Sequence, residues 1–131
     1  MEITEKEKKA LLASQQGELD AVQMYQALAI AVRSEADAAV FRTLAAEEGK
    51  HAGVFYSLTQ EKRTPDKKLS VLLTALYRVL GRKRLYPLIA KGEYAAAKRY
   101  QSLTEKFPEV KAVLDDENRH GDMIMALLAN Q

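Results

Sequence analysis

Two short motifs of ligating side chains stand out in this sequence. Its two histidines, His51 and His120, each follow a glutamate by three residues, at Glu48 and Glu117. On an α-helix this spacing places both side chains on one face, so a single turn can chelate a metal ion. Glutamate oxygens and neutral imidazoles suit iron or manganese, and also zinc. The two motifs therefore indicate a metal site.

Two further glutamates complete an internal repeat. Glu18 and Glu93 each precede a tyrosine by seven residues, at Tyr25 and Tyr100. The order along the chain is a single glutamate, a Glu-x-x-His pair, a second single glutamate and a second pair. This repeat predicts two halves related by a two-fold axis through the site.

The hydrophobic pattern predicts the helices that position these residues. Apolar side chains recur every three or four residues on four long segments. Glu18, Glu48, Glu93 and Glu117 each interrupt one of these apolar stripes, and the two histidines lie on the same faces. All six side chains are therefore expected to point into a shared core.

Burying these groups together requires compensating positive charge. A buried carboxylate without a partner costs several kcal/mol or is forced to take up a proton. No lysine or arginine lies on the inward faces, whereas two divalent cations would neutralise four carboxylates. We therefore predict two metal ions, iron with manganese or zinc as alternatives. The predicted ligands are Glu18, Glu48, His51, Glu93, Glu117 and His120, and no other catalytic residue is assigned.

Capping residues and a polar segment predict where the helices in the first half of the chain begin and end. Thr4 and Glu7 form the pattern of a capping box at the start of the first helix. Ser34 is a favourable cap for the second helix. Residues 61–68 are polar and contain Pro65, which predicts a loop.

The second half is expected to contain a short helix and two long ones. The short amphipathic helix is expected over 69–80, and the next helix over about 85–106 with Pro87 in its first turn. Pro108 is expected to open the last helix. The chain is thus predicted to be an all-α, single-domain (1–131) four-helix bundle, with a crossover connection that carries a short extra helix.

Composition excludes several classes of site and partner. The chain has no cysteine, so it has neither disulfides nor a thiolate-bound metal or iron–sulfur centre. Its net charge of +2 gives no indication of nucleic acid binding. We expect no signal peptide and no membrane span, and hence a cytoplasmic protein. A homodimer is plausible, because long amphipathic helices leave partly apolar outer faces.

The motifs carry a family resemblance. The segments EEGKH at 47–51 and DENRH at 116–120 look like the (D/E)-E-x-x-H motifs of the ferritin-like superfamily of di-iron carboxylate proteins. DENRH is similar to the form found in oxygen-activating di-iron enzymes. The arrangement over nearly the whole chain resembles rubrerythrin, and residues 85–127 look most like its third and fourth helices.

The resemblance implies roles for individual residues. Glu48 and Glu117 would bridge the two ions, while Glu18 and Glu93 would be terminal ligands, and each ion would have one histidine. Rubrerythrins carry a second glutamate on the third helix, which supports an iron shift during peroxide reduction. Ala96 stands at that position here, and the family's rubredoxin-like Cys₄ domain is absent.

The resemblance also implies an activity. It implies an oxidoreductase of oxidative-stress type that reduces H₂O₂ or O₂, as a peroxidase or ferroxidase, with electrons from a separate, unidentified donor. One alternative is a non-catalytic protein that binds or stores iron or manganese. Another is a helical interaction module whose buried carboxylates are structural. Metal content and turnover with peroxide distinguish these three hypotheses.

For four residues near the predicted ligands, the sequence allows two roles each. Glu47 and Asp116 either accept a hydrogen bond from a ligand imidazole or face solvent. Tyr25 and Tyr100 either hydrogen-bond the ligand carboxylates or are ordinary buried tyrosines with satisfied hydroxyls.

Overall fold

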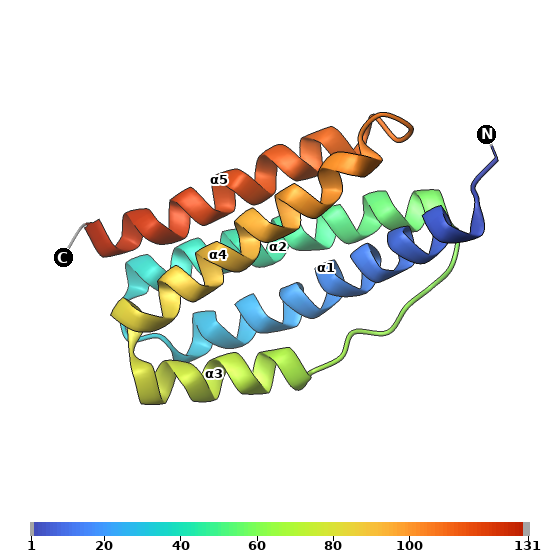
Figure 1. Ribbon diagram of the computed structural model, residues 1–131. Coiled ribbons are helices and arrows are strands. Elements are labelled where there is room, and N and C mark those ends of the chain that lie inside the picture. Colours follow the sequence, from blue (N-terminus) through green and yellow to red (C-terminus); the bar gives the residue numbers. More distant parts are fainter. Residues whose placement is uncertain (1, 130–131) are drawn as a thin grey trace.

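The computed structural model describes residues 2–129, and these residues form helices and connecting segments with no strand. The helices are α1 (Glu5–Ala31), α2 (Glu35–Thr59), α3 (Lys68–Leu80), α4 (Arg82–Tyr100) and α5 (Val110–Ala129), with a 3₁₀ turn, η1 (Gln101–Leu103). Four long helices lie side by side, and α3 lies along α1 at the edge (Figure 1). The predicted all-α bundle, with a short extra helix in its crossover, is confirmed. None of the described helices is long and apolar enough to cross a bilayer.

The bundle consists of two antiparallel pairs, α1 with α2 and α4 with α5 (Figure 1). The cap signals of the first pair are confirmed. Thr4 Oγ1 accepts a hydrogen bond from the Glu7 amide at 3.1 Å, and Glu7 Oε1 accepts one from the Thr4 amide at 2.9 Å. Ser34 Oγ accepts one from the Asp37 amide at 3.2 Å. These bonds satisfy amide groups that a helix start leaves unpaired.

The crossover between the two pairs is held against α1 by polar side chains of that helix. Gln15 donates to the Glu61 carbonyl at 2.8 Å, and Gln16 donates to the Thr64 carbonyl at 2.9 Å. Asp20 accepts from the Asp66 amide at 2.7 Å. An extended segment without regular structure needs such partners for its backbone groups. The predicted loop at 61–68 is confirmed, although its last residue already belongs to α3.

The structure corrects the predicted limits of α4. This helix starts at Arg82, directly after Gly81, whose positive φ of 75° ends α3 and turns the chain. Pro87 was predicted to lie in the first turn of the helix. It lies inside the helix instead, because the helix begins earlier than predicted. The helix also ends at Tyr100, where the 3₁₀ turn η1 replaces the predicted continuation to residue 106. A tighter turn of this kind is common at a helix end.

The apolar core is divided into two clusters by a layer of charged side chains. One cluster contains Tyr25 and Phe41, and the other contains Leu11 and Phe55. On α1, Glu18 lies between Leu11 of one cluster and Tyr25 of the other. The same alternation occurs on the other three long helices, so the charged layer crosses the middle of the bundle.

A buried ion pair away from this layer ties the start of α4 to α2. Arg82 donates to both carboxylate oxygens of Asp37, at 2.9 and 3.0 Å, and Tyr86 donates to the same carboxylate at 2.6 Å. Arg82 also donates to the Leu127 carbonyl at 2.9 Å. Asp37 is 2 % exposed and is shielded from solvent, whereas the side chain of Arg82 is 27 % exposed. These bonds fix the end of the crossover against α2 and α5.

We expect Asp37→Ala to lower the free energy of unfolding by about 2 kcal/mol. Breaking a fully buried pair costs roughly 3–5 kcal/mol, and the partial exposure of Arg82 reduces this value. Urea unfolding of the wild type and the variant measures the difference. Glu35→Ala is the control, because its carboxylate lies in the same helical turn but is exposed and pairs with Arg42 at the surface. Equal losses in the two variants would contradict a structural role for the buried pair.

Candidate metal centre

The structure brings all six predicted ligand side chains into one buried layer. They project from four helices: Glu18 from α1, Glu48 and His51 from α2, Glu93 from α4, and Glu117 and His120 from α5. None is more than 6 % exposed. The inward phase predicted for each helix is therefore correct, while metal binding by these groups stays a prediction.

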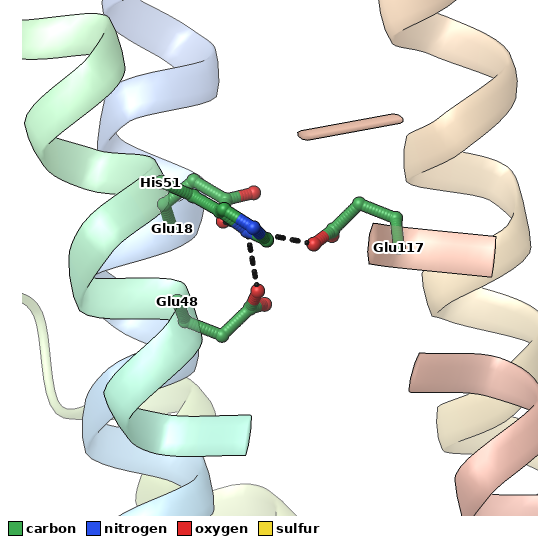
Figure 2. A group of neighbouring side chains, drawn as sticks. All are labelled: Glu18, Glu48, His51 and Glu117. Atoms are coloured by element: carbon green, nitrogen blue, oxygen red, sulfur yellow. Dashed lines mark hydrogen bonds and ion pairs between the residues drawn. The ribbon is translucent and has the colours of Figure 1, made fainter. Parts of the chain in front are cut away.

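The six side chains form two groups that share two members. In each group one ligand atom per residue lies within 4.8 Å of the others. The first group is Glu18, Glu48, His51 and Glu117, drawn in Figure 2. The second group is Glu48, Glu93, Glu117 and His120. Because Glu48 and Glu117 belong to both, the arrangement is consistent with a binuclear site.

Each group gathers carboxylates around one imidazole nitrogen. Nδ1 of His51 lies 3.0 Å from Glu18 Oε1, 2.9 Å from Glu48 Oε1 and 3.0 Å from Glu117 Oε1. In Figure 2 the carboxylate of Glu48 approaches this ring from the same helix, α2, and that of Glu117 approaches it from the facing helix, α5. Nδ1 of His120 lies 3.4 Å from Glu48 Oε1 and from Glu93 Oε2, and 3.6 Å from Glu117 Oε1.

Three buried atoms of the second group have no hydrogen-bond partner among the described residues. They are Glu93 Oε2, Glu117 Oε1 and His120 Nδ1. Glu117 Oε1 approaches His51 Nδ1, but without the angles of a hydrogen bond. Leaving such atoms unpaired is costly, typically 1–3 kcal/mol each. Atoms bound to one ion at roughly 2.0–2.2 Å lie about 3.0–3.6 Å apart, so the second group has the chemistry and spacing for a cation.

The outer nitrogens of the two histidines are held by carboxylates from the opposite helix. Nε2 of His51 lies 2.7 Å from Asp116 Oδ2, and Nε2 of His120 lies 2.8 Å from Glu47 Oε1. Arg119 donates to both Glu47 and Asp116. Such bonds place the proton on Nε2 and leave the Nδ1 lone pair for a metal. The interpretation of Glu47 and Asp116 as hydrogen-bond acceptors is therefore confirmed.

This network lowers the pKa values of its carboxyl groups. Burial alone would raise the pKa of Glu47, but hydrogen bonds from His120 and Arg119 outweigh it, so the pKa is lowered. The same balance lowers the pKa of Asp116, with His51 and Arg119 as donors. Both groups therefore stay charged near neutral pH and can hold the imidazoles in place.

The sequence analysis missed two features of this network. It did not identify Arg119, and it did not show that each carboxylate serves the histidine of the other helix. Arg119 immediately precedes His120 within the DENRH motif, so its position was the available signal. The pairs His51–Asp116 and His120–Glu47 are contacts between two helices. The residue spacing within either motif does not indicate such contacts.

Both tyrosines of the internal repeat hydrogen-bond a predicted ligand. Tyr100 donates to Glu18 Oε2 at 2.6 Å, and Tyr25 donates to Glu93 Oε1. Burial and the nearby carboxylates raise the pKa of each hydroxyl well above its ordinary value, so both keep their protons. The interpretation that assigned them to the ligand carboxylates is confirmed. Each bond runs between α1 and α4 and therefore fixes the two single glutamates relative to each other.

A glycine allows α4 and α5 to approach closely beside the site. A Cβ atom on Gly121 would lie 2.5 Å from the ring of Tyr94, so no larger residue fits without movement of that ring. The Tyr94 hydroxyl donates to Asp122 at 2.6 Å, which anchors the ring. This contact holds the backbone that carries Glu93 next to the backbone that carries His120.

The protonation of the cluster reflects burial and crowding. Burial raises the pKa of Glu18 to about 7 and that of Glu117 to about 11. Burial also acts against the charge on Glu48, but the two adjacent imidazoles lower its pKa to about 2. Burial disfavours the histidine cations, yet the adjacent carboxylates raise the pKa of His120 to about 10 and raise that of His51 as well. Without cations the cluster therefore retains protons that metal ions would replace.

Comparison with known proteins identifies a family for part of the chain. A family model described as Rubrerythrin matches residues 9–83. No curated protein and no solved structure matches the chain. The matched segment contains Glu18, Glu48 and His51, whereas Glu93, Glu117 and His120 lie beyond it and are placed by the geometry alone. The closer likeness expected for residues 85–127 stays a prediction.

Proposed function

Because the chain belongs to the rubrerythrin family, we propose that it is a di-iron carboxylate oxidoreductase that reduces hydrogen peroxide or dioxygen. The observation that supports this function is the pair of overlapping buried ligand groups that share Glu48 and Glu117. A di-iron oxidoreductase needs a site that keeps two redox ions close together, and a pair of shared carboxylates would do so. These 131 residues contain no cysteine and therefore no thiolate-bound iron that could supply electrons, so in this proposal the electrons come from a donor outside them.

In this proposal Glu18 and His51 would hold one ion and Glu93 and His120 would hold the other. Glu48 and Glu117, which belong to both groups, would contribute to both. When bound, the two irons supply Lewis acidity and the electrons for reduction of the oxidant. Asp116 and Glu47 keep the imidazoles in the orientation that ligation requires. Four carboxylates balance the charge of two divalent ions, which lowers the cost of burying the site.

The tyrosines contribute protons held at defined atoms. The hydroxyl of Tyr25 directs its proton at Glu93, and the hydroxyl of Tyr100 directs its proton at Glu18. Both tyrosines line the cavity beside the site. Reduction of peroxide to water consumes protons as well as electrons, so these hydroxyls are suitably placed to pass them on. Apolar clusters on both sides of the charged layer exclude bulk water from these two directions along the bundle.

We expect iron(II)-loaded protein to react with H₂O₂ about tenfold faster than with O₂, and both faster than free Fe²⁺ does. Ala96 is buried in the cavity wall one turn from Glu93. Ala96→Glu should raise the preference for peroxide further, because it adds the carboxylate that the resemblance leads one to expect. Stopped-flow absorbance in the near ultraviolet, with each oxidant in turn, measures the two rates.

Ala95→Glu is the matched control, because Ala95 is the adjacent exposed residue on the same helix. An equal change of preference in both variants would contradict a local role for position 96. Rates no faster than those of free Fe²⁺ would exclude the enzyme and favour the non-catalytic iron or manganese protein. A tenfold preference for O₂, about 1.4 kcal/mol in the barrier, would indicate a ferroxidase instead.

A further inference from the structure

A cavity extends from the charged layer towards the surface between α1 and α4. Its volume is about 350 Å³, and Glu18, Glu48, Glu93 and Glu117 form part of its wall. No Cα atom of α1 lies within 8 Å of a Cα atom of α4, whereas α1 packs closely on α2 and α4 packs closely on α5. The opening between α1 and α4 is therefore a feature of the backbone arrangement.

The cavity is far larger than the proposed oxidants require. A water molecule occupies roughly 30 Å³ of liquid volume, and H₂O₂ and O₂ are only slightly larger. A volume of 350 Å³ instead falls within the range of small-molecule binding sites, about 300–1,000 Å³. The cavity can therefore hold an organic molecule.

The shape of the cavity favours a narrow, elongated molecule. Leu85 and Arg99 both line it, and a helix rises about 21 Å over the residues between them. Its walls include Gly17 on α1 and Gly92 on α4, where an added Cβ would meet nothing within 4 Å. This volume spread over this length suits an unbranched chain better than a ring system.

The lining of the cavity is mostly apolar. Met24, Leu73 and Ile89 are buried in its wall, while Leu69 and Leu88 are 37 % and 55 % exposed. Exposed leucines at a cavity rim leave apolar surface in contact with water, and an alkyl chain would cover it. Each methylene group that leaves water strengthens binding by roughly three- to fourfold.

One cation at the cavity wall has no partner. Arg99 lines the cavity and forms no ion pair with any side chain in residues 2–129. The four glutamates at the inner wall are already balanced by two divalent cations in the proposed site. Arg99 is thus the uncompensated positive charge of this surface, and a guanidinium binds a carboxylate with two parallel hydrogen bonds.

We propose that this cavity binds an unbranched alkyl carboxylate of medium length. The chain lies between α1 and α4 against the apolar wall, and the carboxylate pairs with Arg99. The bound chain then passes alongside Glu93 and Glu117, so it also controls access to the charged layer. This binding requires the cavity, Arg99 and divalent cations that balance the four glutamates of the inner wall. It rests on the metal-binding part of the proposed function and holds whether or not the metal centre is a redox enzyme.

Calorimetric titration of decanoate into the full chain loaded with zinc tests the proposal without any redox reaction. We expect one decanoate per chain, and hexanoate should bind at least about tenfold more weakly. Arg99→Met should weaken decanoate binding by about tenfold but leave decyl alcohol within threefold of its wild-type affinity. Lys91→Met is the matched control, because Lys91 is a basic residue of α4 that does not line this cavity.

A second pair of variants tests the location of the chain. Gly17→Leu should weaken both decanoate and decyl alcohol by about tenfold or more, because the new side chain occupies the cavity. Gly53→Leu is its control, since Gly53 is also helical with open space around it but lies outside the cavity. Metal content and thermal unfolding of each variant establish that the bundle is intact.

Three results would overturn the proposal. Equal effects of Arg99→Met on decanoate and decyl alcohol would refute the carboxylate assignment. Equal effects of Gly17→Leu and Gly53→Leu would place the chain elsewhere. Absence of decanoate binding, together with a dimer that Leu88→Glu dissociates, would show that a second copy of the chain covers the rim of the cavity.

Discussion

Glu48→Ala protein is expected to bind neither of the two metal ions that are predicted for the wild type, and Glu117→Ala is expected to behave in the same way. Each carboxylate belongs to both ligand groups, so its removal takes a ligand from both ions at once. Glu18→Ala removes a ligand from the first group only and should leave one ion per chain. Elemental analysis after iron or manganese reconstitution and gel filtration gives the number of ions directly.

Glu47→Ala provides the contrast that makes this prediction specific. Glu47 precedes Glu48 in the sequence but belongs to neither ligand group. It contacts the outer nitrogen of His120, which does not face the other predicted ligands. Removing such a contact typically lowers metal affinity by about 10–100-fold without abolishing binding. Competition with a chelator measures that loss. A Glu47→Ala protein as deficient in metal as Glu48→Ala would show that the ligand assignment on α2 is wrong.

Failure to fold is not expected to obscure the comparison. Glu48 lies beside both imidazoles in the metal-free protein, so its removal costs some stability. Glu18 and Glu117 still lie beside His51, and Glu47 still lies beside His120. Metal-free Glu48→Ala protein should therefore keep its helical circular dichroism. A loss of metal with retention of the fold separates a ligand role from a structural one.

The helices and the ligand layer were predictable because both depend on local periodicity. A charged residue in the middle of an apolar stripe can only point inwards, and this reasoning correctly placed Glu18, Glu48, Glu93 and Glu117 in the core. Capping at Thr4 was equally predictable, since the two residues of a capping box lie three positions apart.

Features that depend on contacts between distant segments were not predictable in the same way. Asp37 resembled an ordinary first-turn acid, and only the fold shows that Arg82 and Tyr86 enclose it. The start of α4 was placed too late, because Gly81 reverses the chain without any linker before the next helix. The cavity between α1 and α4 depends on how far apart the helices pack, which hydrophobic spacing does not determine.

Metal-free protein is expected to be less stable at pH 8 than at pH 5, by several kcal/mol. Burial raises the pKa of Glu18 from 4.5 to about 7, so its favourable contribution is complete below pH 4.5 and is lost as the pH rises to 7. The pKa of His120 is raised from 6.5 to about 10, and its contribution is lost above 6.5. The pKa of Glu48 is shifted in the opposite direction, from 4.5 to about 2. Its contribution to the free energy of unfolding is therefore lost only as the pH falls below 4.5. All changes between pH 5 and pH 8 therefore act in one direction.

Urea unfolding of the metal-free protein at pH 5 and pH 8 tests this sign. Glu18→Gln should reduce the difference without removing it, because the raised pKa values of Glu117 and His120 act in the same direction. Glutamine keeps the size of the side chain but cannot ionise, so the repulsion that develops with rising pH is reduced. The metal-loaded protein should show the reverse trend, because metal ions displace the same protons and bind more tightly as the pH rises. Greater stability of the metal-free protein at pH 8 would mean that the carboxylates are better solvated or better paired than their burial implies. The two pH profiles together therefore test whether the charged layer is built to hold cations, independently of any activity.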